Sequence, residues 1–254
     1  LIVYAWWPLA EELLDYIDWQ GPWWLYFDWL LVGIWLVMSM LIMASADLKV
    51  DVWIIFVGFI GGLVIESWGT QTEIWWYYTA ERPPLWIIPA WPIASLSIDR
   101  LVRFLRRGIQ ESSVENKPQP TKLVLPVHFH AWLFKALYWL VFPAFFVLML
   151  AYVWPTLDKS FTILSLILVA ILILTPTDHR LAVLTFTSGS ALGYFLELWG
   201  TTRQCWTYYT LGTPPLFAVL AHGMAAVAFW RTVLVLQRFK PKVMPRNRKR
   251  STTE

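Results

Sequence analysis

The stretch Glu66-Ser-Trp-Gly-Thr-Gln-Thr-Glu-Ile-Trp-Trp-Tyr-Tyr-Thr79 recurs 131 residues later as Glu197-Leu-Trp-Gly-Thr-Thr-Arg-Gln-Cys-Trp-Thr-Tyr-Tyr-Thr210. The same offset aligns residues 47–107 with 178–238 without a gap, and 21 of the 61 aligned pairs are identical. Unrelated segments of average composition would share only about 4 pairs. The chain therefore contains a duplicated structural unit.

The composition around this repeat is that of a membrane protein. Of the 254 residues, 58% are apolar, 15% are charged and 19 are tryptophan. Soluble domains carry roughly 25% charged residues. A disordered chain and a disulfide-stapled secreted domain are both excluded, because apolar residues dominate and Cys205 is the only cysteine.

Seven apolar segments approach the roughly 20 residues that a membrane-spanning helix needs. They are residues 23–46, 50–68, 84–105, 131–153, 160–175, 180–199 and 215–236. We therefore expect an all-α integral membrane protein with about seven transmembrane helices.

The basic residues predict the direction of these spans. They collect in residues 100–122 and 231–250, whereas the first 48 residues contain no Lys or Arg. By the positive-inside rule, both basic clusters face the cytoplasm and the N-terminus lies outside. We expect an integral protein of a bacterial inner membrane, with the C-terminus in the cytoplasm and an interfacial helix over residues 4–19 on the outer surface.

The repeats should run the same way through the membrane, because four spans separate equivalent points. A pseudo-two-fold axis along the membrane normal would relate the two three-helix groups, with the fourth span as a connector. The expected organisation is an outer segment (1–20), repeat unit one (21–107), a cytoplasmic loop and connector helix (108–153), repeat unit two (154–238) and a basic cytoplasmic tail (239–254).

Glycines recur every fourth residue before each repeated Glu. Gly58 and Gly62 precede Glu66, and equivalent glycines precede Glu197. Small residues at this spacing indicate a close helix contact in lipid, so each Glu should point toward packed protein. We expect Gly69 and its equivalent to adopt the left-handed turn that ends a helix, and the Pro-Pro pair that follows to begin the next span.

A carboxyl group among aromatic rings has two interpretations. In the first, Glu66, Glu197 and His222 are catalytic acid–base groups, and aromatic faces shelter a carbocation or bind a quaternary ammonium headgroup. The ligand-binding candidates are Trp68, Trp75, Tyr77, Tyr78, Trp199, Trp206, Tyr208 and Tyr209. In the second, the same residues cap and bridge helices without any chemistry. Residue 222 is a His only in the second repeat, which makes that copy the better candidate for activity.

The Glu-x-x-Gly motif, with the Tyr-rich stretch, prolines and Trp that follow it, resembles the integral-membrane carotenoid hydratase and cyclase families over about 20 residues per repeat. The spacing from the Glu to the tyrosines is shorter here than in those families. The resemblance implies an isoprenoid ligand.

Three functions remain open. The first is an outer-side site that binds an isoprenoid or other membrane lipid and modifies it. The second is a non-catalytic accessory or assembly subunit of a membrane complex, of the pigment-binding or electron-transfer type, with Trp-rich loops contacting partner proteins. The third is a transporter with its pathway between the repeats. With four histidines and no phosphate or dinucleotide motif, the sequence predicts no metal site and names no cofactor, and its short basic tail does not indicate nucleic-acid binding.

Overall fold

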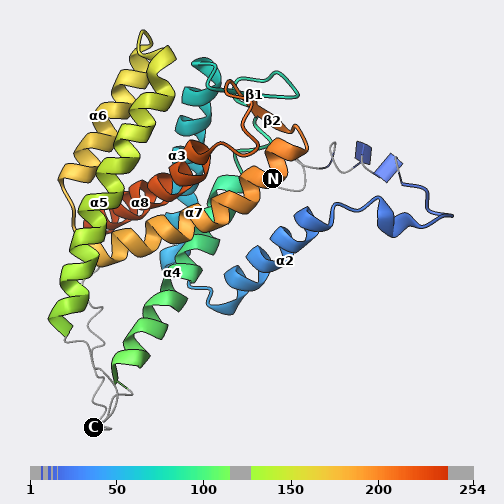
Figure 1. Cartoon of the computed structure of the whole chain (residues 1–254). Coiled ribbons are helices and arrows are strands. Elements are labelled where there is room, and N and C mark those ends of the chain that lie inside the picture. The colour runs from blue at the N-terminus through green and yellow to red at the C-terminus, as the bar shows by residue number, and fades with distance from the viewer. Residues whose placement is uncertain (1–6, 8–10, 13, 16, 115–126, 240–254) are drawn as a thin grey trace, which may run out of the picture.

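The computed structural model describes residues 7, 11–12, 14–15, 17–114 and 127–239. Most of this part of the chain is helical, and the expected all-α fold is confirmed (Figure 1). The elements are η1 (Trp23–Leu25), α2 (Trp29–Ala44), α3 (Leu48–Gln71), β1 (Trp75–Tyr77), α4 (Ala90–Val114), α5 (Val127–Val153), η2 (Trp154–Thr156), α6 (Ser160–Leu174), α7 (His179–Thr202), β2 (Trp206–Tyr208) and α8 (Leu216–Arg238).

The elements repeat in the same order on either side of α5. Helices α2, α3 and α4 with strand β1 correspond to α6, α7 and α8 with strand β2. The first residues of α3 and α7, like those of α2 and α6, are 131 positions apart, which is the offset of the sequence repeat. The first helix of each unit therefore belongs to the repeat, although it lies outside the aligned residues.

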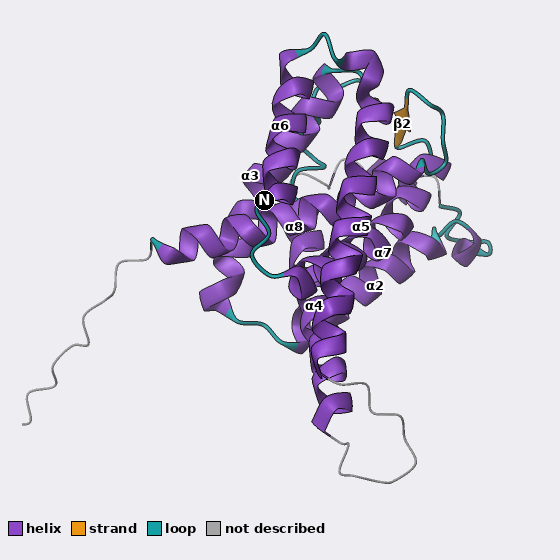
Figure 2. Cartoon of the chain, turned by 60° about the vertical axis from the view of Figure 1, so that its left-hand side comes forward, coloured by secondary structure: helices purple, strands orange, loops and turns teal. Residues whose placement is uncertain are grey.

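The two units are joined by a two-stranded antiparallel ribbon that the sequence did not lead us to expect. In it Trp75 pairs with Tyr208, Trp76 with Thr207, and Tyr77 with Trp206. The central pair consists of equivalent positions of the two repeats, so a pseudo-two-fold axis passes between Trp76 and Thr207. Figure 2 shows β2, one strand of this ribbon, at one edge of the helical body.

The expectation that Gly69 and its equivalent adopt the left-handed turn at the helix end is wrong. Gly69 and Gly200 lie inside α3 and α7, and neither has a positive φ. The left-handed conformation occurs instead at Glu73 and Gln204, with φ of 62° and 58°.

The Pro-Pro pair also acts differently in the two units. Pro215 is the N-cap of α8, whereas the residues after Pro84 form turns and α4 begins only at Ala90. A helix that began after Pro84 would place Pro89 where a backbone N–H is needed, and Pro89 has none. The second unit has Leu220 at that position, so its helix can begin earlier.

The long helices pack against one another both within each unit and between the two units. Helix α3 packs against α4, α7 against α8, and α4 also packs against α7. The largest buried apolar cluster joins α5, α7, α8 and both strands, and it includes the fully buried Tyr138 and Phe142. Helices α5 and α6 lie side by side at one edge of the molecule (Figure 1).

Four of the described helices are long and apolar enough to cross a membrane, judged by length and composition. They are α3, α5, α7 and α8, and α2 and α6 are shorter apolar helices. Many large apolar side chains on these helices are exposed, for example Met43, Val64 and Leu174. Half of residues 4–19, where an interfacial helix is expected, fall outside the described residues. Part of the basic loop (115–126) and most of the basic tail (240–254) also lie outside them.

Candidate functional site

Glu66 lies at the centre of the first repeat and accepts three hydrogen bonds. The indole Nε1 of Trp75 and the hydroxyl of Tyr77 donate to Oε2 at 3.1 and 2.8 Å, and the indole Nε1 of Trp91 donates to Oε1 at 3.0 Å. The residue is only 4% exposed. The carboxyl group is therefore held by donors from β1 and from α4.

Glu197 has the same arrangement in the second repeat, with one change. Trp206 Nε1 donates to Oε2 at 2.9 Å and the hydroxyl of Tyr208 donates to Oε1 at 2.8 Å. The third partner is His222 Nε2, which lies 2.9 Å from Oε1 and replaces the indole. Glu197 is 3% exposed, so this carboxyl group is also buried.

The shared spacing of the glycines in the two repeats has a steric cause. A Cβ at Gly62 would overlap the ring of Trp91, and one at Gly193 would overlap His222. At Gly69, a Cβ would overlap the indole of Trp75. These glycines let a ring lie directly on the helix backbone within reach of the Glu one turn away.

The two centres touch at the pseudo-two-fold axis. The rings of Trp91 and His222 are stacked, with centroids 5.5 Å apart and an interplanar angle of 18°. The ring of Tyr77 also contacts that of Trp206 across the ribbon at 5.9 Å. We refer to the eight side chains as the carboxylate–aromatic cluster; they are Glu66, Trp75, Tyr77, Trp91, Glu197, Trp206, Tyr208 and His222.

The phenols of the cluster act as donors. Burial, and then the charge and hydrogen bond of Glu66, raise the pKa of Tyr77 well above its usual range. Burial and the neighbouring Glu197 do the same to the pKa of Tyr208. Both hydroxyls therefore stay protonated, and each can donate to its carboxyl group without losing a proton at neutral pH.

The remaining predicted ligand-binding residues lie outside this cluster. Trp68 Nε1 donates to Thr162 Oγ1 at 3.3 Å, and Trp199 Nε1 donates to Asp28 Oδ2 at 2.9 Å. Each of these indoles thus ties a repeat to the first helix of the other repeat. Tyr78 and Tyr209 are more exposed, and the hydroxyl of Tyr209 donates to the carbonyl of Tyr152 at 2.5 Å.

Trp91 is a cluster member that sequence reasoning did not place in the site. It occupies the position in the first repeat that is equivalent to His222 in the second. The two positions are equivalent in the repeat, and each places a ring nitrogen against the preceding Glu.

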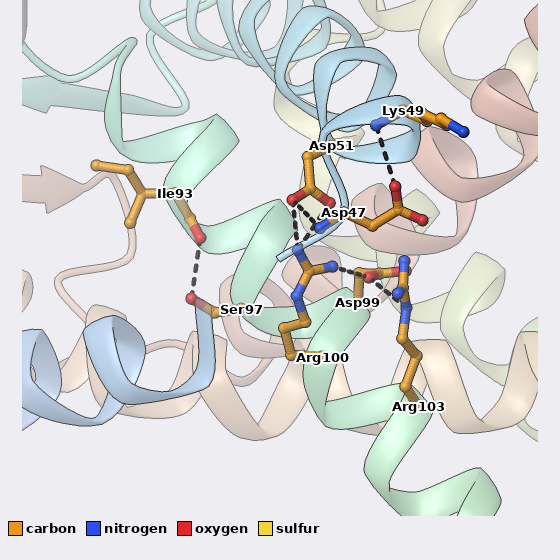
Figure 3. A network of polar contacts seen from close by, with 8 residues as sticks. All are labelled: Asp47, Lys49, Asp51, Ile93, Ser97, Asp99, Arg100 and Arg103. Atoms are coloured by element: carbon orange, nitrogen blue, oxygen red, sulfur yellow. Dashed lines mark hydrogen bonds and ion pairs between the residues drawn. The ribbon is translucent and has the colours of Figure 1, made fainter. Parts of the chain in front are cut away.

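A second polar network lies between α3 and α4, away from the cluster (Figure 3). Arg100 Nη2 lies 2.7 Å from both carboxylate oxygens of Asp51, and Arg100 Nη1 donates to Asp99 at 2.5 Å. Asp51 and Arg100 are both buried. The second repeat has Ala182 and Trp230 in place of the two acids, so only the first unit carries this buried ion pair.

Two pockets lie beside the described helices and strands, and the second of them reaches Trp75 of the carboxylate–aromatic cluster. One, of about 460 Å³, is apolar and lies between α5, α7 and α8, with Val141, Phe186, Ser190 and Leu220 among its lining residues. The other, of about 390 Å³, lies at the ribbon and is lined by Thr70, Glu73, Trp75, Trp76, Arg82 and Tyr209. Neither is lined by Glu66, Glu197 or His222.

Within the described residues, no three His, Cys, Asp or Glu side chains are grouped so that they could hold a metal ion. The side chains of His128 and His130 fall outside the described set. Comparison of the chain with protein-family models, with curated proteins and with solved structures finds no match.

Proposed function

We propose that the chain is an integral membrane protein that crosses the bilayer seven times. Four helices have the required length and composition. Helix α4 is the repeat equivalent of α8, which is one of those four, and the repeats are related by a pseudo-two-fold axis. Equivalent helices of a parallel repeat cross the membrane in the same direction. Helices α2 and α6, which are also equivalent, complete the seven.

The proposed orientation places the ribbon on the outer side of a bacterial inner membrane. The basic side chains Arg103, Arg106 and Arg107 follow the buried part of α4, and Arg238 ends α8. The ribbon lies at the opposite ends of α4 and α8. A cytoplasmic location of the basic ends agrees with the positive-inside rule.

We propose that the protein acts as a non-catalytic accessory or assembly subunit of a membrane complex. One observation carries this proposal: both buried carboxyl groups already have hydrogen-bond partners. Each is hydrogen-bonded to three side chains, which are indole, phenol or imidazole groups. A catalytic acid must reach a substrate, and neither of the two pockets described above is lined by either Glu. The cluster has the geometry of a rigid connection between two helical units.

An exposed aromatic segment that runs up to the first residue of α2 supports contact with a partner. Trp23, Trp24 and Trp29 are all exposed, and rings from this segment pack on one another, as in the Trp23–Phe27 contact at 5.5 Å. Aromatic residues at the membrane interface also anchor a protein to lipid, and they are enriched at protein contacts.

The experiment that tests this role is native-membrane extraction in a mild detergent, followed by native mass spectrometry. We expect the chain in a heteromeric complex of fixed stoichiometry, and loss of that complex when Trp23 and Trp24 are changed to Ser. The matched control changes Val64, exposed on α3, to Ser. A chain that runs as a monomer carrying only lipid would contradict the accessory role.

A second candidate function, binding of an isoprenoid or acyl chain, is favoured by the apolar pocket between α5, α7 and α8. Its volume of about 460 Å³ is in the range of small-molecule sites. Ser190, one of its lining residues, has a buried hydroxyl without a hydrogen-bond partner. If a lipid chain occupies this pocket, Ala191→Trp should lower the amount of co-purified lipid while the complex still assembles.

A further inference from the structure

The pocket at the ribbon combines both signs of charge with aromatic walls. Glu73 lies in the turn after α3, and Arg82 follows β1; Arg82 Nη1 donates to Glu73 Oε1 at 3.0 Å. Trp76, which is 43% exposed, and Tyr209, which is 36% exposed, are part of the same lining. The pocket thus offers an anionic group, a cationic group and ring faces within about 390 Å³.

The ion pair across this pocket is weak enough for a ligand to replace it. The side chains of Arg82 and Glu73 are 54% and 69% exposed, and they are joined by one contact. Ion pairs with this exposure contribute little to stability, because water screens both charges. A ligand that carries both a positive and a negative group can pair with Glu73 through the first and with Arg82 through the second. Breaking the ion pair between these two side chains then leaves neither charge without a partner.

The corresponding place in the second repeat lacks this chemistry. Gln204 and Thr213 occupy the positions equivalent to Glu73 and Arg82, and Thr207 occupies that of Trp76. The backbone conformation is the same, since Glu73 and Gln204 have φ of 62° and 58°. The turn therefore forms without the two charges and the exposed indole. These groups are a feature of the first repeat that the backbone does not require.

We propose that this pocket binds a zwitterionic group that contains a phosphate and an ammonium. The phosphate would pair with the guanidinium of Arg82, whose N–H groups suit phosphate oxygens. The ammonium would lie against Glu73 and the faces of Trp76 and Tyr209, because aromatic rings and a carboxylate together recognise such cations. Two sources share this chemistry: the headgroup of a zwitterionic phospholipid and a free phosphorylated amino alcohol.

The position of the pocket favours a lipid source. Thr70 lies at the end of α3, a helix with the length and composition of a membrane span, and the pocket begins at that end. The headgroup region of a bilayer lies where such helices end. Headgroup binding is independent of the accessory role, so either can fail while the other stands.

The test measures lipid retention on the purified full chain by native mass spectrometry, after exchange into mixed micelles of phosphatidylethanolamine, phosphatidylcholine and phosphatidylglycerol. We expect the wild type to retain a zwitterionic lipid in preference to phosphatidylglycerol. The double variant Glu73→Gln with Arg82→Thr, which carries the residues of the second repeat, should lose about tenfold in retention. A second variant, Trp76→Thr, keeps both charges and should also reduce retention.

The matched control is Glu81→Gln with Lys159→Gln, which removes one acid and one base outside the pocket and should retain lipid like the wild type. Soluble phosphocholine is added in a separate arm. Displacement of the lipid by phosphocholine would identify a free zwitterion as a ligand, and retention of the lipid would identify the phospholipid. Equal retention by the wild type and both pocket variants, or equal retention of phosphatidylglycerol, would overturn the proposal.

Discussion

Replacing each buried Glu by Gln should have unequal effects on the two repeats. At Glu66, one oxygen accepts from Trp75 and Tyr77 and the other accepts from Trp91. An indole nitrogen can only donate. In Glu66→Gln the amide nitrogen replaces one of the two oxygens, and in either orientation it faces an indole N–H. The amide N–H and the indole N–H are both donors, so neither can accept a hydrogen bond from the other.

At Glu197 the amide has a satisfactory orientation. Its nitrogen can replace Oε1, where the neighbours are the hydroxyl of Tyr208 and the ring of His222. Both can accept a hydrogen bond, because a hydroxyl rotates and a neutral imidazole has one unprotonated nitrogen. The remaining oxygen still accepts from Trp206. Every hydrogen-bond donor around residue 197 then still has an acceptor.

A buried group left without its partner costs about 1 to 3 kcal/mol, so Glu66→Gln should lower the free energy of unfolding by that amount. Glu197→Gln should cost less than about 1 kcal/mol, since its hydrogen bonds are exchanged for others. Thermal unfolding of both variants in one detergent, followed by tryptophan fluorescence, measures the difference.

Adding Trp91→His to Glu66→Gln supplies an acceptor and should recover part of the loss, and Trp91→His alone is the control. Equal destabilisation by the two Gln variants would refute the hydrogen-bond assignment, as would failure of the added His to improve on Glu66→Gln.

Three other changes test the packing, the buried ion pair and the topology. Gly62→Leu should destabilise the protein by about 1 to 3 kcal/mol because the added side chain overlaps an indole, whereas Val64→Leu on the exposed face should be nearly neutral in the same unfolding assay. Asp51→Asn should lower the free energy of unfolding by about 3 kcal/mol, which is the lower end for a broken buried ion pair, because Arg100 keeps its contact with Asp99. A shift of the unfolding midpoint no larger than that of Val64→Leu would contradict this. Single Cys substitutions of Gln71 and Ser112 should be labelled from opposite sides of the membrane, and labelling of both from one side would refute the proposed topology.

Much of the helical architecture could be predicted from the sequence, because long apolar runs and a gapless repeat are strong patterns. The ribbon could not, since strands of three residues are too short to show an alternating pattern. Its Trp and Tyr residues also fit an aromatic belt at a membrane interface, so their presence does not by itself indicate pairing.

The candidate site was predicted in part. The glycine spacing correctly indicated that Glu66 and Glu197 face packed protein. It did not reveal that Gly69 makes room for the ring of Trp75, because a glycine near a helix end is equally typical of a C-terminal turn. Which donors reach each carboxyl group depends on the fold of the loop that follows, and no local pattern encodes it.

The two repeats meet about a pseudo-two-fold axis at the ribbon, and a disulfide across that axis tests this arrangement most directly. Equivalent residues Trp76 and Thr207 face each other in the antiparallel register. Hydrogen-bonded pairs in such ribbons have Cα atoms about 5.5 Å apart, within the range that a disulfide bridges. In a Cys205→Ser background, Cys at 76 and 207 should form an intramolecular disulfide in native membranes, whereas Cys at 76 and 210 should not. Absence of the 76–207 disulfide, or equal cross-linking of both pairs, would contradict the symmetric docking of the repeats.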